Sequence, residues 1–162
     1  MENSGLLAFE IRKANSPEEF AEGRELFMEY ENSLGFRIDF QNFEEELEEI
    51  AIQYGSPDGA LFIAYHHANP VACIAIRKIN DEIGELKRMF VQPGFRRNGL
   101  GRKLLQLAIE EAGELRFHKI RLDSLERMQP ALKLYEDFGF YAIASYRFNP
   151  FDDAVFLEKQ LE

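Results

Sequence analysis

The stretch from Gly84 to Leu115 constrains the fold more than any other part of the chain, because it joins three different local patterns. Residues 85–91 are typical of a strand, and Pro93-Gly94 indicates a turn after it. Beyond a glycine-rich basic loop at residues 96–101, apolar residues recur at the three- and four-residue spacing of one helix face. A strand, a glycine loop and a helix N-terminus in this order predict an anion site, because the first helical N–H groups lack internal partners and attract negative charge.

The charge distribution supports an anionic ligand at this loop. Acidic residues outnumber basic ones 29 to 19, yet no Asp or Glu occurs between Leu86 and Ile109. The basic residues in this window are Lys87, Arg88, Arg96, Arg97, Arg102 and Lys103. A local basic patch on an acidic protein favours a small polyanion and argues against nucleic acid or an anionic membrane as the partner. The alternative is a solvated loop whose arginines serve solubility.

Length and composition predict one domain that spans residues 1–162. No apolar run is long enough for a membrane span, and the N-terminus does not resemble a secretory signal. Cys73 is the only cysteine, which excludes an internal disulfide and fits a cytoplasmic protein. Its position in an apolar run predicts a buried strand residue. The histidines show no metal-ligand spacing, so we expect no metal site.

Periodicity along the chain predicts the element order β-α-α-β-β-β-α-β-α-β-β, which is an α+β domain with a mixed, twisted sheet of about seven strands. The expected strands cover residues 8–14, 60–66, 70–79, 85–91, 119–123, 140–144 and 154–159. The expected helices begin after a capping box at Ser16, cover residues 40–54, continue from the glycine loop to Leu115, and cover residues 129–138.

The predicted helix over residues 40–54 carries an acidic face. Its members are Glu44, Glu45, Glu46, Glu48 and Glu49. We interpret this face as solvated, which is the usual place for a run of charges on a helix. The alternative interpretation is an acidic rim that attracts a cationic amine.

Two motifs identify the family that this chain resembles. The sequence from Val91 to Gly101, VQPGFRRNGLG, resembles the acetyl-CoA motif of the GNAT N-acetyltransferase superfamily, Gln/Arg-x-x-Gly-x-Gly/Ala after a strand that ends in Val-x-Pro. A second match, LYEDFGF over residues 134–140, lies at the expected distance downstream. The resemblance covers most of the chain and implies the GNAT fold with helices on both faces of the sheet. One departure is Met128, where several members have an Asn that contacts the cofactor.

The resemblance implies where acetyl-CoA would bind. In the family, the strand before the glycine loop bulges and splays from its neighbour, and its backbone pairs with the pantetheine arm; here that backbone belongs to Met89, Phe90 and Val91. The loop amides would hold the pyrophosphate, and further basic side chains would reach the phosphates. The residues concerned are Arg96, Arg97, Asn98, Gly99, Leu100, Gly101, Arg102 and Lys103.

The resemblance also implies the groups that would move protons. Tyr135 matches the family's tyrosine, which is placed to protonate the sulfur of coenzyme A as a general acid; its periodicity alone would also fit a core aromatic. Glu85 and Asp123 lie on two central strands at positions where different members keep a carboxylate base. Either side chain, or water alone, could take the proton of the amine.

The acceptor cleft of this fold is lined by the connection of the first two helices and the loop before the last strand. These are Tyr30 to Phe36 and Tyr146 to Asp153, with Asn149-Pro150 marking a turn. The second segment could recognise a small zwitterionic amine, or only close the sheet edge. The expected activity is acetyl transfer to a small-molecule primary amine by direct attack in a ternary complex. A peptide or protein acceptor and a non-catalytic acyl-CoA-binding module are the alternatives, and a homodimer through a sheet edge is plausible.

Overall fold

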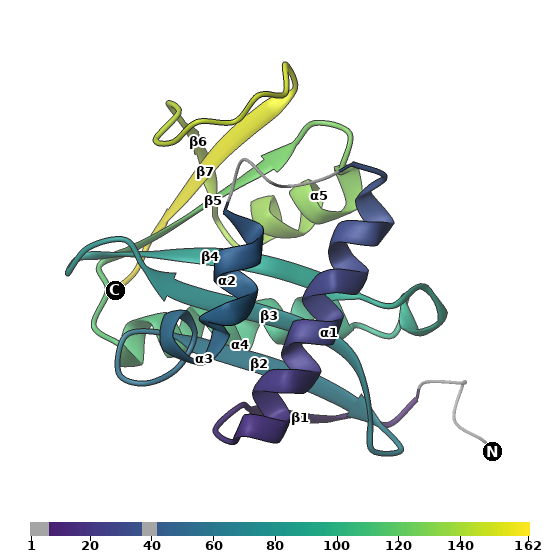
Figure 1. The fold of residues 1–162 in the computed structure, drawn as a ribbon. Helices are drawn as coiled ribbons and strands as arrows, with labels where there is room; N and C mark the ends of the chain where they lie inside the picture. The colour runs from purple at the N-terminus through teal and green to yellow at the C-terminus, as the bar shows by residue number, and fades with distance from the viewer. Residues whose placement is uncertain (1–6, 37–41) are drawn as a thin grey trace.

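The structure of the chain is a computed structural model, which describes residues 7–36 and 42–162. Seven strands of the described chain form one mixed sheet, as expected, and their order in it is β1-β2-β3-β4-β5-β7-β6 (Figure 1). The strands are β1 Glu10–Lys13, β2 Ala60–His66, β3 Asn69–Lys78, β4 Ile83–Val91, β5 Lys119–Leu125, β6 Tyr141–Ile143 and β7 Ala154–Gln160. The helices are α1 Pro17–Leu34, α2 Phe43–Glu48, α3 Ile50–Gln53, the short η2 Pro93–Phe95, α4 Leu100–Glu114 and α5 Gln129–Asp137.

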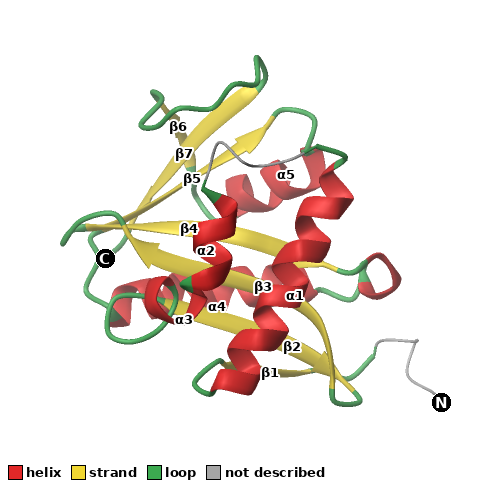
Figure 2. Cartoon of the chain, viewed as in Figure 1, coloured by secondary structure: helices red, strands yellow, loops and turns green. Residues whose placement is uncertain are grey.

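The helices cover both faces of the sheet, which confirms the predicted layers (Figure 2). Helices α1, α2 and α3 share one core with the strands, in which Phe27 and Tyr54 are fully buried. Helix α4 packs on the opposite face through Leu104, Leu105 and Ala108, which belong to the second core together with residues of α5. Within residues 7–36 and 42–162, no helix is long and apolar enough to cross a membrane.

Helix α1 begins and ends as its sequence predicts. The Ser16 hydroxyl accepts a hydrogen bond from the Glu19 backbone N–H at 3.1 Å, and Pro17 occupies the first turn. The Glu19 side chain in turn accepts from the N–H of Asn15 at 2.8 Å. The helix ends at Gly35, whose φ of 79° is the left-handed conformation that glycine adopts without a Cβ clash.

A bulge and a splay at β4 position the candidate site. Strand β4 pairs in parallel with β5 only from Ile83 to Glu85, and the two strands then diverge (Figure 1). On its other side, Cys73 of β3 faces Phe90 and Ala75 faces Lys87, so β4 carries one extra residue there. Arg88 within this bulge has a φ of 61°, which is unusual for a residue other than glycine. The bulge and the splay implied by the family resemblance are therefore both present.

Three expectations about α2, α3 and β4 are wrong in part. The pattern over residues 40–54 forms two short helices, because the chain breaks at Glu49; Phe40 lies outside the described residues. The acidic face is not wholly solvated either, since the side chain of Glu46 is buried against Arg88. Lys87 and Arg88, which we counted in the anion-binding patch, are likewise buried in the sheet.

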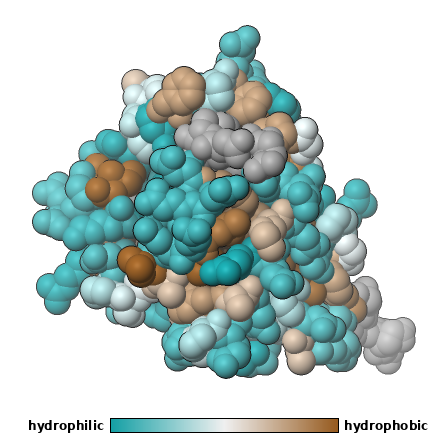
Figure 3. Space-filling view, in the orientation of Figure 1, coloured by the Kyte–Doolittle hydropathy of each residue, from teal (hydrophilic) through white to brown (hydrophobic). Residues whose placement is uncertain are grey.

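The surface of the α1–α3 face reflects this arrangement. In the space-filling view, hydrophilic side chains predominate over α2, and hydrophobic side chains show as separate patches among them (Figure 3). The exposed glutamates of α2 therefore do form part of a solvated surface, with Glu46 turned inward. Cys73 is buried in β3, as its apolar context predicts.

Candidate active site

The glycine loop leads directly into α4, which begins at Leu100. Gly99 is the N-cap, and its φ of 79° requires the left-handed conformation that favours glycine. The first four N–H groups of a helix have no partner inside it, and the first turn of α4 holds no acidic residue. The loop therefore offers N–H donors and the positive end of a helix dipole to an anion.

Side chains of the loop also hold its own backbone. The Arg96 Nε donates to the Val91 carbonyl at 2.8 Å. The Asn98 Nδ2 donates to the carbonyls of Phe95 at 3.1 Å and Arg96 at 3.2 Å. These hydrogen bonds fix the loop in its turn, so that Asn98 shapes the loop through its side chain rather than facing the cavity.

A cavity of about 550 Å³ lies between this loop, the β4 bulge and the N-terminal turn of α5. Its lining includes most of the residues predicted to contact the cofactor: Met89, Phe90, Val91, Arg96, Arg97, Gly99, Leu100 and Gly101. Two predicted phosphate ligands lie elsewhere. Arg102 pairs with Asp137 at 3.1 Å, and Lys103 is exposed on the first turn of α4.

A second, smaller cavity of about 80 Å³ fills the splay between β4 and β5. It is lined by both strands and by the first turns of α5, and it holds Tyr135 and Asp123 together with Lys87. Burial raises the pKa of Tyr135, and the neighbouring Tyr30 and Asp123 raise it further. The phenol is therefore protonated at neutral pH and can act as a proton donor.

Three of the four predicted acceptor residues meet at a third cavity, next to the splay. Tyr30, Phe36 and Asn149 line it together with Asp123. The Asn149 Nδ2 donates to the Asp123 Oδ2 at 3.1 Å, which fixes the carboxylate against the loop before β7. The rings of Phe36 and Phe151 pack with centroids 4.6 Å apart and connect that loop to the end of α1.

Tyr30 joins these three cavities, because its side chain lines each of them. Burial raises the pKa of Tyr30, and Arg88 partly opposes the rise. Its ring packs edge-on against Phe90 at 6.0 Å. Tyr30 of α1 is thus surrounded by three surfaces: the predicted cofactor surface, the cavity of Tyr135 and Asp123, and the acceptor wall.

Glu85 and Tyr146, which the sequence also placed at the site, lie in a different cavity. Glu85 accepts hydrogen bonds from Arg77 at 3.0 Å, Arg147 at 2.9 Å and the Tyr146 hydroxyl at 2.8 Å. Burial alone would raise the pKa of Glu85, but Lys87, Arg147 and Arg77 hold it below its ordinary value. A carboxylate held in this way is a weak proton acceptor, so the geometry favours Asp123 over Glu85 as a base.

The bulge is held in place by a buried ion pair that the sequence analysis missed. The guanidinium of Arg88 contacts the Glu46 carboxylate through two hydrogen bonds of 3.0 and 2.5 Å, and the Tyr54 hydroxyl donates to the same carboxylate at 2.8 Å. Burial would raise the pKa of Glu46, but Arg88 lowers it below its ordinary value. Helix α2 thereby connects to the strained residue of the bulge.

Lys87, which the sequence analysis placed in the basic patch, lies instead at the splay. It lines the splay cavity, and its exposed fraction is only 5%. Burial lowers the pKa of Lys87 to about 7, with Arg88 contributing and Glu85 opposing the change. The signal was present in the sequence, because two consecutive basic residues inside a predicted central strand must be buried or carried at a bulge.

Comparisons with known proteins agree with this geometry. A family profile described as the acetyltransferase (GNAT) family matches residues 20–140. An uncharacterized N-acetyltransferase of Schizosaccharomyces pombe is 29% identical over 153 residues, which cover 93% of this chain and 94% of the relative.

Solved structures with the same fold cover the whole length of the chain. A GNAT-family acetyltransferase from Staphylococcus aureus aligns with a TM-score of 0.80 at 26% identity, covering 96% of this chain and 100% of the other. The PaiA N-acetyltransferase of Thermoplasma acidophilum, solved in complex with coenzyme A, aligns with a TM-score of 0.72 at 18% identity, covering 95% and 99%. The second likeness concerns the fold alone.

Proposed function

The chain belongs to the GNAT family of acetyltransferases, and from this premise we propose that it transfers an acetyl group from acetyl-CoA to a primary amine of a small molecule, by direct attack in a ternary complex. The observation that carries the proposal is the meeting of three cavities at Tyr30. One presents the glycine loop, one holds Tyr135 and Asp123, and one faces the acceptor wall. A two-substrate transfer needs these three surfaces side by side.

The residues at the first cavity fit a cofactor with a pyrophosphate and an extended arm. When bound, acetyl-CoA supplies the acetyl group as a thioester. The amides at the start of α4 and the side chain of Arg97 would hold the phosphates, since both offer N–H donors and positive charge. The bulge of β4 and the splay from β5 leave strand backbone at Met89 and Phe90 to hold the arm.

The proton balance of the reaction assigns roles to two side chains. An ammonium group must lose a proton before its nitrogen can attack, and a departing thiolate must gain one. Asp123 would accept the first proton, directly or through water, because it lies between the splay and the acceptor wall. Tyr135 would hold the second, since its raised pKa keeps the hydroxyl protonated.

Thiol release from acetyl-CoA in the presence of an amine panel tests the proposal. The panel should contain small primary amines and short peptides with and without a blocked N-terminus. We expect release with at least one class of small amine. Release only with peptides would show that the acceptor is a peptide or protein amine and not a small molecule. Binding of acetyl-CoA without thiol release for any amine would favour a non-catalytic acyl-CoA-binding module.

A further inference from the structure

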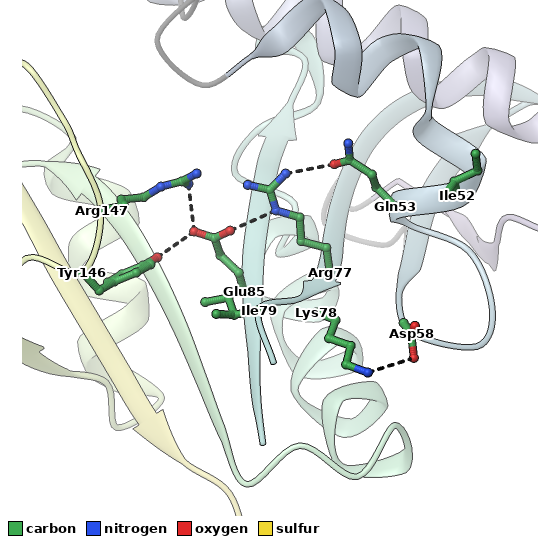
Figure 4. A pocket seen from close by; sticks show the side chains of 9 residues that line it. All are labelled: Ile52, Gln53, Asp58, Arg77, Lys78, Ile79, Glu85, Tyr146 and Arg147. Atoms are coloured by element: carbon green, nitrogen blue, oxygen red, sulfur yellow. Dashed lines mark hydrogen bonds and ion pairs between the residues drawn. The ribbon is translucent and has the colours of Figure 1, made fainter. Parts of the chain in front are cut away.

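A cavity of about 500 Å³ lies on the α1–α3 face beside the first half of β4, and its lining differs from that of the three cavities around Tyr30 (Figure 4). Residues of α3, β3 and β4 form one side of it, and the loop before β7 forms the other. Its floor carries Arg77, Glu85 and Arg147, and Ile52 and Ile79 belong to its lining. Both isoleucines are exposed, so the cavity combines a charged floor with apolar side chains at the surface.

Two guanidinium groups share a single carboxylate at this floor. Arg77 and Arg147 approach Glu85 from opposite sides, and their charged ends point toward one another across it (Figure 4). Glu85 is 2% exposed and ionised at neutral pH, because its pKa lies below the ordinary value. Two positive charges against one negative charge leave an excess of one positive charge in a partly desolvated place.

Lys87 lies next to this excess of positive charge. It lies two residues beyond Glu85 on β4, so both side chains occupy the same face of the strand before the bulge. Burial lowers the pKa of Lys87 most, and Arg88, Arg77 and Arg147 lower it further, whereas Glu85 opposes them. The positive potential thus extends from this cavity to the splay cavity that Lys87 lines.

The two arginines retain donors that a ligand can use. A guanidinium has five N–H groups; in the hydrogen bonds between side chains of the described residues, Arg77 uses Nε and Nη1, and Arg147 uses Nη1. Their side chains are 19% and 25% exposed, and both residues line the cavity. Paired guanidiniums of this kind match the geometry of a carboxylate.

We propose that a carboxylate group of the acceptor amine binds to Arg77 and Arg147 on the cavity side of Glu85. A second carboxylate would balance the charge of the two guanidiniums, and the exposed isoleucines would contact the chain that carries it. The strand register sets the length of this acceptor, because Asp123 lies two residues, or about 7 Å, beyond Arg121, the β5 partner of Glu85. The acceptor is therefore an extended amino acid with its amine and carboxylate at opposite ends. This inference rests on the proposed function.

The kinetic test compares 8-aminooctanoate with 8-aminooctanamide, which have equal length and differ only in the carboxylate. We expect kcat/KM of the wild-type enzyme to favour the carboxylate by about ten- to hundredfold, the usual effect of hydrogen bonds to a charged group. Arg147→Gln should remove this preference, so that the ratio of kcat/KM for the two amines falls to about one whatever the value for the amide alone. Arg24→Gln, which removes an exposed positive charge from α1, is the matched control and should keep the preference.

A binding measurement separates this inference from the proposed activity. Octanoate is titrated into labelled wild-type, Arg147→Gln and Arg24→Gln proteins while the backbone amide signals of residues 77, 85 and 147 are followed by NMR. Saturable shifts in the wild type and in Arg24→Gln that are absent in Arg147→Gln support the site, even if neither amine is acetylated. Acetylation with equal preference for both amines overturns the inference but not the activity. The absence of shifts in the wild type also overturns the inference.

Discussion

The buried pair of Glu46 and Arg88 gives the sharpest prediction about stability. Their side chains are 1% and 3% exposed, and they are joined by two hydrogen bonds. Glu46→Gln keeps the shape of the side chain and leaves the charge of Arg88 uncompensated in the protein interior. Breaking a buried ion pair in this way typically costs about 3–5 kcal/mol, so we expect the free energy of unfolding to fall by that amount.

Urea unfolding of the variant at neutral pH measures this loss. Glu45→Gln is the matched control, because Glu45 is exposed on the same helix and should change stability by no more than about 0.5 kcal/mol. Glu46→Leu combined with Arg88→Met should recover most of the lost stability, since an apolar pair needs no compensation. A loss below about 1 kcal/mol for Glu46→Gln would refute the reasoning.

The pH dependence of stability follows from the same pair. The pKa of Glu46 is lower in the folded protein than its ordinary value of 4.5, because Arg88 outweighs the effect of burial. The stability contributed by Glu46 is therefore fully present above about pH 4.5 and is lost as the pH falls through the folded-state pKa. The acid slope of the unfolding free energy should be shallower in Glu46→Gln than in the wild type.

Two predictions concern the transfer groups. Tyr135→Phe should lower kcat by about 10²-fold or more and leave the Kd of acetyl-CoA nearly unchanged, because only a proton donor is lost; an unchanged kcat would reduce Tyr135 to a packing role. Asp123→Asn should lower kcat/KM at neutral pH by about 10²-fold or more, whereas Glu85→Gln should lower it far less. The opposite pattern would return the role of base to Glu85.

The order of elements could be predicted because local patterns determine it. Strand β2 occupies the predicted residues, and β4 and β5 each extend two residues beyond the predicted range at one end. The glycine loop could also be predicted from the sequence, because the positive φ of Gly99 and the helix start at Leu100 are determined by residues that are close in the chain. These features depend on the spacing of apolar residues and on the conformational freedom of one glycine.

The rest of the site depends on contacts between distant segments. Glu46 and Arg88 lie 42 residues apart, so no local sequence pattern could predict which glutamate of the acidic helix would point into the core. The sequence also gave no sign that Glu85 and Tyr135 face separate cavities, because one lies on β4 and the other on α5, and only the packing of these elements sets their relative position. Arg77 and Arg147 meet at Glu85 only after the loop before β7 has folded over the sheet.

The central claim is that the chain binds acetyl-CoA, and calorimetric titration tests it most directly. The roles given to the glycine loop, the bulge and the splay all depend on this binding. Gly99→Glu is the decisive variant: its φ of 79° disfavours any side chain, and the carboxylate would repel a phosphate at the start of α4. Gly94→Ala in the preceding turn is the control, since an added Cβ there meets no atom within 4 Å. We predict one site per chain in the wild type and in Gly94→Ala, and no measurable binding in Gly99→Glu. Equal affinity in all three proteins, or no binding to the wild type, would contradict the account.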